Sequence, residues 1–278
     1  MSGVMLKPWD NLLGEISLHK TIAIVALGVA LVAGAATARA ADTLTLKIGI
    51  EGAYPPFSKT LPSGEIVGFD VDISKALCAE LKAKCELVAQ AWDGMIPALL
   101  EKKFDAIISS MSITEERMKA VAFTNKYYES PVAWVAAKKF KIDPNKTTLK
   151  GKTVGVQSGT VAAAYLEDNY KDVVTIKAYD TQENADLDLV AGRIDLTLAD
   201  LFVLSEGFLK EPDGKNFEVK GKPFTDRKTM GDGIGVALRK EDTALRDKFN
   251  AAIKAIRANG VYKKINDKYF NFDLYGAN

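Results

Sequence analysis

Histidine is almost absent from this chain of 278 residues, which contains only His19. If the amino-terminal segment around His19 is removed, as argued below, no histidine remains. Ser-His-Asp and Cys-His nucleophile arrangements, histidine acid–base catalysis and histidine-based metal sites are then excluded. Carboxylate and lysine chemistry survive this exclusion, so the composition argues against many classes of enzyme without excluding all of them.

A long hydrophobic run is also lacking, apart from one near the amino terminus. The apolar segment Thr21–Ala36 spans about 16 residues, fewer than the roughly 20 that a membrane-spanning helix needs. Two lysines precede it, and a small-x-small cleavage site ends at Ala40. We therefore predict that residues 1–40 are a secretory signal peptide and that the protein is exported. An uncleaved anchor is the alternative, and Met5 could be the true start.

The rest of the chain lacks an excess of charge of either sign. Of the 37 basic and 36 acidic side chains, three and two respectively lie in the first 40 residues, so the predicted mature chain carries no net charge. Binding to nucleic acid or to anionic lipid depends on basic surface charge. We therefore expect neither as a partner.

Cysteine is rare as well, with Cys78 and Cys85 as the two examples. Their C-x6-C spacing fits neither a redox CxxC motif nor a zinc knuckle. In an exported protein a disulfide is the default expectation, and closing so short a loop contributes about 2.5 kcal/mol. We predict a structural disulfide between them, with two free thiols as the alternative.

What the chain does contain is an alternation of strand and helix patterns, typical of the α/β class. The first series begins with an alternating strand from Leu44 and continues with a helix that Asp70 can cap. A second series begins at Thr153 and includes a strand expected at Val173–Ile176. Two amphipathic helices, ending at Tyr269, close the pattern.

The stretch Phe104–Phe123 combines a buried strand with polar side chains. The apolar run Ala106–Ile108 is typical of a strand in a parallel sheet, and Thr114 can cap the short helix that follows. Arg117 lies in the first turn of that helix, where a cation opposes the helix dipole. A guanidinium beside hydroxyls at the carboxyl end of a strand is suited to holding a small carboxylate. A solvated arginine beside an ordinary serine-rich turn is the alternative. The hydroxyls belong to Ser109, Ser110 and Ser112.

A faint internal repeat relates this stretch to a later one. Residues 99–110 (LLEKKFDAIISS) align with residues 189–200 (LVAGRIDLTLAD), which places Asp105 opposite Asp195. Each segment is a helix end, a basic residue and then an aspartate that opens a buried strand. The repeat predicts two similar lobes whose strand ends face each other across a cleft, with Asp200 at one of them. A chance match between two α/β patterns is the alternative.

Several segments together resemble the periplasmic solute-binding proteins of polar amino acid ABC transporters, in particular the lysine/arginine/ornithine- and histidine-binding branch. The segments are IGIEGAYPPF, GFDVDISKALC, AWDGMIPALL, DAIISSMSITEER and KYFNFDLYG, together with the pair of cysteines. The resemblance implies the two-lobe periplasmic binding protein fold of type II, with a ligand cleft between the lobes. Lobe one would contain residues 42–130 and 233–278, and lobe two residues 131–232. The two hinge crossings would lie near Ser130–Val135 and near Asp232–Val236.

The resemblance also assigns residues to the ligand's carboxylate. Arg117 would pair with it, assisted by Ser112. Backbone N–H groups around Thr160 and Val161 would assist as well, since they lie where a helix is expected to begin.

The remaining positions that the resemblance implies surround the ligand's ammonium and side chain. Asp200 would take the ammonium, together with Ser110 and Ser112. Tyr54 and Trp92 would enclose the side chain, with simple core packing as the alternative for this aromatic pair. The residues expected towards the far end of the side chain are Glu51, Asp70 and Ser109. For Asp70 the alternative is a helix cap.

The resemblance implies a monomeric periplasmic protein that captures arginine, ornithine, lysine or histidine by cleft closure and delivers it to a membrane ABC permease complex. No catalytic residue, cofactor or metal is implied. Two departures from the family pattern keep an arginine-derived opine as an alternative ligand. Glu51 stands where an aspartate is usual, and Val161-Ala162 stand where Thr-Gln is usual. An exported dehydratase on the same fold is the alternative from another class, and a sensor role would use the same closure.

Overall fold

The computed structural model describes residues 44–276. The predicted signal peptide, residues 1–40, lies outside the described residues. Across residues 44–276, no helix has both the length and the apolar character that crossing a membrane would require.

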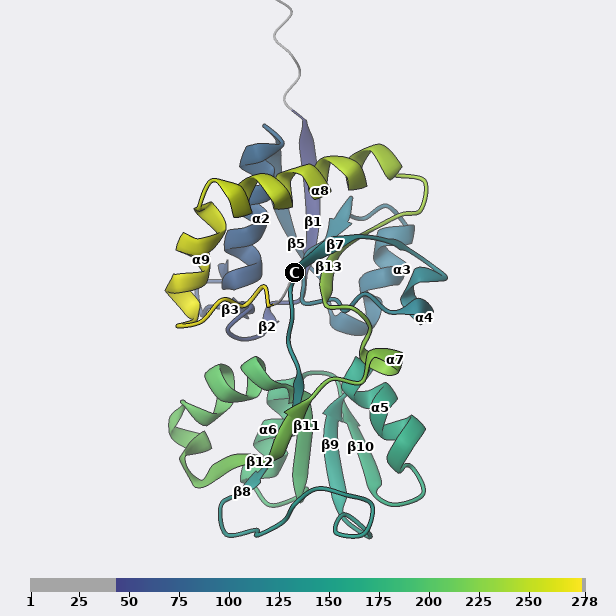
Figure 1. Cartoon of the computed structure of the whole chain (residues 1–278), viewed down its shortest axis with the longest axis vertical. Helices are drawn as coiled ribbons and strands as arrows, with labels where there is room; N and C mark the ends of the chain where they lie inside the picture. The colour runs from purple at the N-terminus through teal and green to yellow at the C-terminus, as the bar shows by residue number, and fades with distance from the viewer. Residues whose placement is uncertain (1–43, 277–278) are drawn as a thin grey trace, which may run out of the picture. The chain divides into compact units, whose positions relative to one another are not determined.

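The first lobe is built on a five-stranded mixed sheet in the order β5-β1-β6-β13-β7. Strand β1 runs parallel to β5 and β6, whereas β13 is antiparallel to both of its neighbours. Helices α2, α8 and α9 pack together (Figure 1). The strands are β1 (Thr45–Ile50), β5 (Lys84–Ala89), β6 (Ala106–Ile107), β7 (Ala122–Tyr128) and β13 (Ile234–Leu238). The helices are α2 (Phe69–Glu80), η1 (Trp92–Gly94), α3 (Met95–Leu100), α4 (Glu115–Met118), α8 (Thr243–Ala258) and α9 (Val261–Tyr269). A small antiparallel sheet is formed by β2 (Ala53–Tyr54), β3 (Ser58–Thr60) and β4 (Ile66–Val67).

The second lobe is built on a second five-stranded sheet in the order β10-β9-β11-β8-β12. Strand β9 runs parallel to β10 and β11, whereas β8 is antiparallel to its neighbours. The strands are β8 (Val132–Ala137), β9 (Thr153–Gln157), β10 (Thr175–Tyr179), β11 (Leu196–Asp200) and β12 (Phe217–Phe224). The helices are α5 (Val161–Tyr170), α6 (Gln182–Val190), η2 (Val203–Leu209), η3 (Pro212–Asn216) and α7 (Arg227–Met230).

The two sheets repeat one plan, which confirms the internal repeat. The aspartates that it aligned make the same hydrogen bond, since Asp105 accepts one from the Lys47 N–H at 2.9 Å and Asp195 accepts one from the Thr153 N–H at 2.8 Å. The first bond joins the start of β6 to its parallel neighbour β1, and the second joins the start of β11 to its parallel neighbour β9. The alignment is therefore structural and not a coincidence of pattern.

The chain passes between the two sheets twice (Figure 1). It leaves the first sheet at Tyr128 and enters the second at Val132. It leaves the second sheet at Phe224, forms α7, and re-enters the first at Ile234. The first passage overlaps the crossing expected near Ser130–Val135, and the second begins earlier than expected and ends within the one expected near Asp232–Val236. The lobe limits at 130/131 and 232/233 stay a prediction.

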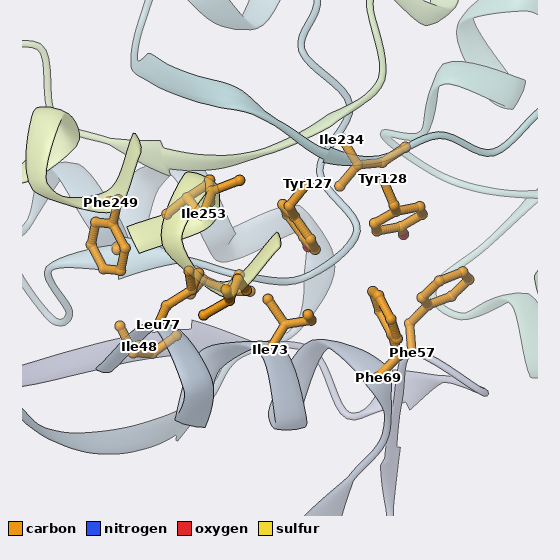
Figure 2. Close-up of a cluster of buried hydrophobic side chains, with 14 of the residues drawn as sticks. Ile48, Phe57, Phe69, Ile73, Leu77, Tyr127, Tyr128, Ile234, Phe249 and Ile253 are labelled. Carbon is orange, nitrogen blue, oxygen red and sulfur yellow. The ribbon is translucent and has the colours of Figure 1, made fainter. Parts of the chain in front are cut away.

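The largest core cluster joins the first sheet to α2, α8 and α9. At one end, aliphatic side chains such as Ile48 and Leu77 pack against Phe249. At the other end, Figure 2 shows Tyr127 and Tyr128 facing Phe57 and Phe69, and the rings of Phe57 and Tyr128 stack with centroids 4.7 Å apart. These aromatic side chains are fully buried, so they form a rigid base beneath the end of the sheet where the cavity described below lies.

The predicted disulfide is present: Cys78 on α2 is bonded to Cys85 on β5. It ties the helix to the edge strand that follows it.

Some expected elements are displaced in the structure. The strand predicted at Val173–Ile176 is β10, which runs from Thr175 to Tyr179. The prediction that Asp70 caps α2 is wrong, because the helix begins at Phe69, its N-cap is Gly68, and no side chain caps it. Asp70 is a fully buried residue of the first turn instead.

Candidate ligand-binding site

One cavity is lined by side chains from both lobes. All of the predicted site residues line it except Asp70, and Gln157 and Ala162 line it as well. The complete lining is Glu51, Tyr54, Trp92, Ser109, Ser110, Ser112, Arg117, Gln157, Thr160, Val161, Ala162 and Asp200.

The polar residues of the cavity lie at the carboxyl ends of equivalent strands. In the first lobe Glu51 follows β1 and Ser110 follows β6. In the second lobe Gln157 ends β9 and Asp200 ends β11. Carboxyl ends of parallel strands meet at one edge of a sheet, where α/β proteins commonly bind ligands. The repeat thus places two matched pairs of polar side chains around one cavity.

Arg117 supplies the positive charge of the cavity. Its guanidinium donates to the Ser112 carbonyl at 3.0 Å and, across the lobes, to the Gly159 carbonyl at 3.1 Å. It also lies over the ring of Trp92, 5.2 Å from the centroid. Burial lowers the pKa of Arg117 to about 10, which still leaves it charged at neutral pH. A charged, partly desolvated guanidinium of this kind attracts a carboxylate strongly.

The helix carrying Arg117 differs from the expectation in one respect. Thr114 caps it as predicted, since its hydroxyl accepts a hydrogen bond from the Arg117 N–H at 3.2 Å. However, α4 is a single turn, Glu115–Met118, so Arg117 belongs to its last turn as much as to its first. The expected conflict with the helix dipole is therefore absent, and the evidence for Arg117 is its place in the cavity.

The amino end of α5 adds further donors beside Arg117. Thr160 is the N-cap, and its hydroxyl accepts a hydrogen bond from the Ala163 N–H at 3.2 Å. The N–H groups of Val161 and Ala162, in the first turn of α5, have no acceptor within the helix. Free backbone donors at a helix amino terminus favour an anion.

Two carboxylates face this positive end. Glu51 accepts a hydrogen bond from the Gln157 amide at 2.6 Å, and Asp200 accepts one from the Tyr54 hydroxyl at 3.1 Å. Both bonds join one lobe to the other. Burial raises the pKa of Glu51 to about 7, against the opposing effect of the Gln157 hydrogen bond. Burial likewise raises the pKa of Asp200 to about 7, although Tyr54 and Arg117 oppose the shift. Desolvated carboxylates are costly unless a cation or a proton joins them.

Lowering the pH should therefore weaken the binding of a cationic ligand. Because the pKa of Glu51 and of Asp200 is raised to about 7, the ligand-free protein takes up protons there as the pH falls below 7. A cation binds the deprotonated carboxylates, so its affinity drops by about tenfold per pH unit for each acid that must be deprotonated. The same shifts stabilise the free fold as the pH falls from 7 towards the usual carboxylate pKa. Calorimetry with L-arginine at pH 7.5 and 5.5 checks this, and equal dissociation constants would contradict it.

The cavity lining differs from the predicted site residues at three positions: Asp70 is absent from it, and Gln157 and Ala162 are additional. Asp70 does not line the cavity; it lies behind Ser110, whose hydroxyl donates to it at 2.9 Å. Gln157 does line the cavity, although it was not among the predicted site residues. The internal repeat contained the signal for it, because pairing β1 with β9 makes Gln157 the counterpart of Glu51.

The aromatic pair Tyr54 and Trp92 contacts the core and lines the cavity at the same time; that it encloses a ligand's side chain stays a prediction. Tyr54 is a buried member of the main core cluster and also lines the cavity. Trp92 packs against a second core cluster and lines the cavity as well. Within residues 44–276 no group of acidic and sulfur side chains is arranged to hold a metal ion.

Comparisons with known proteins agree with this architecture. The model for bacterial extracellular solute-binding proteins, family 3, matches residues 46–272. An L-arginine-binding protein of Pseudomonas aeruginosa is 50% identical over 234 residues, which cover 84% of this chain and 90% of that protein. A lysine/arginine/ornithine-binding periplasmic protein of Escherichia coli strain K12 is 42% identical over 260 residues, covering 93% of this chain and 100% of that protein.

A solved structure supports the same assignment at the level of the fold. An ancestral arginine-binding protein bound to arginine is 35% identical and superposes with a TM-score of 0.76, covering 82% of this chain and 98% of that one. The fold is the two-lobe periplasmic binding protein fold of type II. With a family model that spans nearly all of the described residues, the chain belongs to the bacterial extracellular solute-binding proteins, family 3.

Proposed function

We propose that this protein binds a basic amino acid in the periplasm, with L-arginine preferred, and delivers it to the permease of an ABC transporter. The observation that carries the proposal is the charge of the cavity. Glu51 and Asp200 are acidic and Arg117 is basic, so the fully ionised cavity carries a net charge of −1. A basic amino acid at neutral pH carries the opposite charge. It would neutralise the cavity with one anionic and two cationic groups, one for each of the three side chains.

The positions of these groups suggest how the ligand is oriented. Arg117 and the first-turn N–H groups of α5 would bind its carboxylate, assisted by Ser112. Asp200 would bind the α-ammonium, and Glu51 the cationic end of the side chain. Tyr54 and Trp92 would cover the side chain between these ends, where aromatic ring faces favour a cation.

Transport would depend on closure of the two lobes. The ligand's carboxylate would contact Arg117 from one lobe and the α5 amino end from the other, so both sets of contacts are complete only when the lobes are closed. The ligand then shifts an open–closed equilibrium by its higher affinity for the closed state. The Ser158 hydroxyl donates a hydrogen bond to Asp93 across the lobes, at 2.7 Å. This bond would stabilise the closed form, and neither residue lines the cavity. A monomer suffices for this mechanism, and a permease would recognise the closed surface.

The alternatives are separated by specific features of the cavity. Ala162 has no amide side chain to fill the space beside Val161, which favours a bulkier arginine derivative such as an opine. A dehydratase would need a general acid with a raised pKa, and the pKa of Glu51 is raised to about 7. The relatives compared above are named as binding proteins, which favours binding over catalysis.

A thermal-shift screen against the amino acids and opines tests the proposal. A ligand at 100 times its dissociation constant adds about 2.7 kcal/mol of stability. We expect the largest shift with L-arginine, smaller shifts with ornithine, lysine and histidine, and none with glutamate. A largest shift with a neutral or acidic amino acid would refute the charge argument, and one with an opine would favour that alternative. Turnover of a precursor of the aromatic amino acids, instead of stoichiometric binding, would identify an enzyme.

A further inference from the structure

Asp70 lies beneath the cavity without lining it, and both of its carboxylate oxygens are engaged. One accepts a hydrogen bond from the Ser110 hydroxyl and the other from the Tyr127 hydroxyl, each at 2.9 Å. We propose that Asp70 is a positioning residue, which holds Ser110 in the backbone conformation that ligand binding requires. The inference rests on the proposed function, because it concerns affinity for the ligand.

The backbone at Ser110 is unusual. Its φ angle is +52°, in the left-handed region that side chains with a Cβ atom rarely adopt. The geometry of the site explains why such a conformation is needed. Neighbouring residues of an extended strand point to opposite faces, yet Ser109 and Ser110 are adjacent and both line the cavity. The chain must therefore turn sharply after β6, and Met111 then enters the core.

The turn brings three hydroxyls to one cavity and needs an anchor on the buried side. Ser110 donates its hydroxyl away from the cavity, to Asp70, so the side chain is tied to α2. The equivalent position of the second lobe is Asp200, the proposed ammonium ligand. Ser110 therefore occupies one of the two matched strand ends, and displacing it would alter the lining of the cavity.

The anchor is itself fixed by the core. Asp70 and Tyr127 are both fully buried, and the carbonyl of Tyr127 accepts a hydrogen bond from the Tyr262 hydroxyl at 2.8 Å. In Figure 2 Tyr127 stands within the cluster that joins the first sheet to α2 and α8. The Asp70 carboxylate thus connects the side chain of Ser110 to a rigid part of the lobe. The neighbouring residues of the turn have connections of their own, since Ser109 Oγ accepts from the Glu51 N–H at 3.0 Å and the Met111 carbonyl accepts from the Gly235 N–H at 3.1 Å.

A carboxylate suits this position because it can accept on both sides. Asparagine has the same shape but offers one acceptor oxygen and one NH2 donor. In Asp70→Asn one of the two hydroxyls would face the NH2 group and could only accept from it, so the hydroxyl hydrogen of either Ser110 or Tyr127 would lose its acceptor. Glycine at position 110 would remove this dependence, because it adopts a positive φ without steric cost.

A double-mutant cycle tests the inference, using calorimetry with L-arginine on the wild type, Asp70→Asn, Ser110→Gly and the double variant. We expect Asp70→Asn to raise the dissociation constant at least tenfold in the wild type and less than threefold in the Ser110→Gly background. A purely structural role for Asp70 would lower the melting temperature of the ligand-free protein equally in both backgrounds and leave no coupling in affinity. An equal factor in both backgrounds, or an unchanged dissociation constant in Asp70→Asn, would overturn the inference.

A second comparison keeps the inference testable if Asp70→Asn does not fold. Ser110→Ala and Ser110→Gly both lose the hydroxyl, but alanine keeps the unfavourable left-handed backbone and glycine does not. Ser110→Gly should therefore bind L-arginine more tightly than Ser110→Ala, and equal or reversed affinities would contradict the positioning role. Failure of the wild type to bind any amino acid would overturn the proposed function and the inference together. If the wild type prefers another amino acid, the cycle is run with that one.

Discussion

Replacing Arg117 with alanine is expected to abolish binding of every amino acid ligand while leaving the fold intact. Arg117 is the one basic side chain of the cavity lining. Without it the ligand's carboxylate would be buried beside Asp200 and Glu51 with no cationic partner. Truncating one member of a buried charge pair costs about 2–5 kcal/mol or more, which corresponds to a loss of affinity of roughly 30-fold to several thousand-fold. Calorimetry with L-arginine on the variant and the wild type measures the loss.

Two further variants separate the role of Arg117 from general effects of charge. Arg246→Ala removes an arginine of α8 that does not line the cavity, and it should bind as the wild type does. Arg117→Lys keeps the charge but loses the planar fork that can donate two parallel hydrogen bonds to a carboxylate, so an intermediate affinity is expected. The ligand-free melting temperature reports on the fold in each case. Near-native affinity in a folded Arg117→Ala would rule out the proposed orientation of the ligand.

The two-lobe organisation could be predicted because the same local plan occurs twice in the chain. An aspartate at the start of a buried strand can be recognised from a few consecutive residues. Its hydrogen bond forms wherever that strand lies next to the same parallel neighbour, as it does in both lobes. A glycine on each neighbouring strand completes the plan. A Cβ atom on Gly49 would lie 2.6 Å from the Phe104 ring, and one on Gly155 would lie 2.4 Å from Ile194. Phe104 and Ile194 are themselves equivalent in the repeat, so both lobes pack a large side chain against a glycine.

Most of the candidate site could be predicted for a related reason. Side chains that follow strands collect at one edge of a sheet, whatever the details of packing. Asp70 could not be placed in this way. An aspartate before an apolar helix has the same sequence pattern whether it caps the helix or is buried in its first turn. The difference is decided by Ser110 and Tyr127, which lie 40 and 57 residues further along the chain.

Element ends were the least predictable feature, as β10 illustrates. Its predicted span, Val173–Ile176, contains three apolar side chains in four residues. The observed strand continues through Lys177 to Tyr179 because its backbone pairs with β9 up to Gln157. Only Ile176 and Tyr179 in this edge strand are partly buried, so its side chains carry little hydrophobic pattern. The register of the neighbouring strand, which no local pattern reveals, sets where β10 ends.

Replacing Glu51 with glutamine should reduce affinity for L-arginine by about 10-fold to 150-fold and change affinity for L-glutamine little. The substitution preserves shape, and the new side chain can still accept the hydrogen bond that the Gln157 amide now donates at 2.6 Å. Its main effect is therefore to remove one negative charge. Hydrogen bonds to charged groups contribute about 1.5–3 kcal/mol, and arginine would lose this contribution at its guanidinium. Glutamine carries no side-chain charge and would lose only a neutral contact.

Selectivity among ligands follows from the same group. A planar guanidinium can stack on Tyr54 or Trp92 and donate to both oxygens of Glu51, whereas an ammonium presents a compact charge. Wild-type protein should prefer arginine to ornithine and lysine, and Glu51→Gln should narrow that preference. Glu183→Gln is the matched control: Glu183 lies near enough to raise the pKa of Glu51 but does not line the cavity, so its loss should leave the ratio of arginine to glutamine affinity nearly unchanged. If arginine loses no more affinity than glutamine in Glu51→Gln, the selectivity for a cation must come from elsewhere in the cavity.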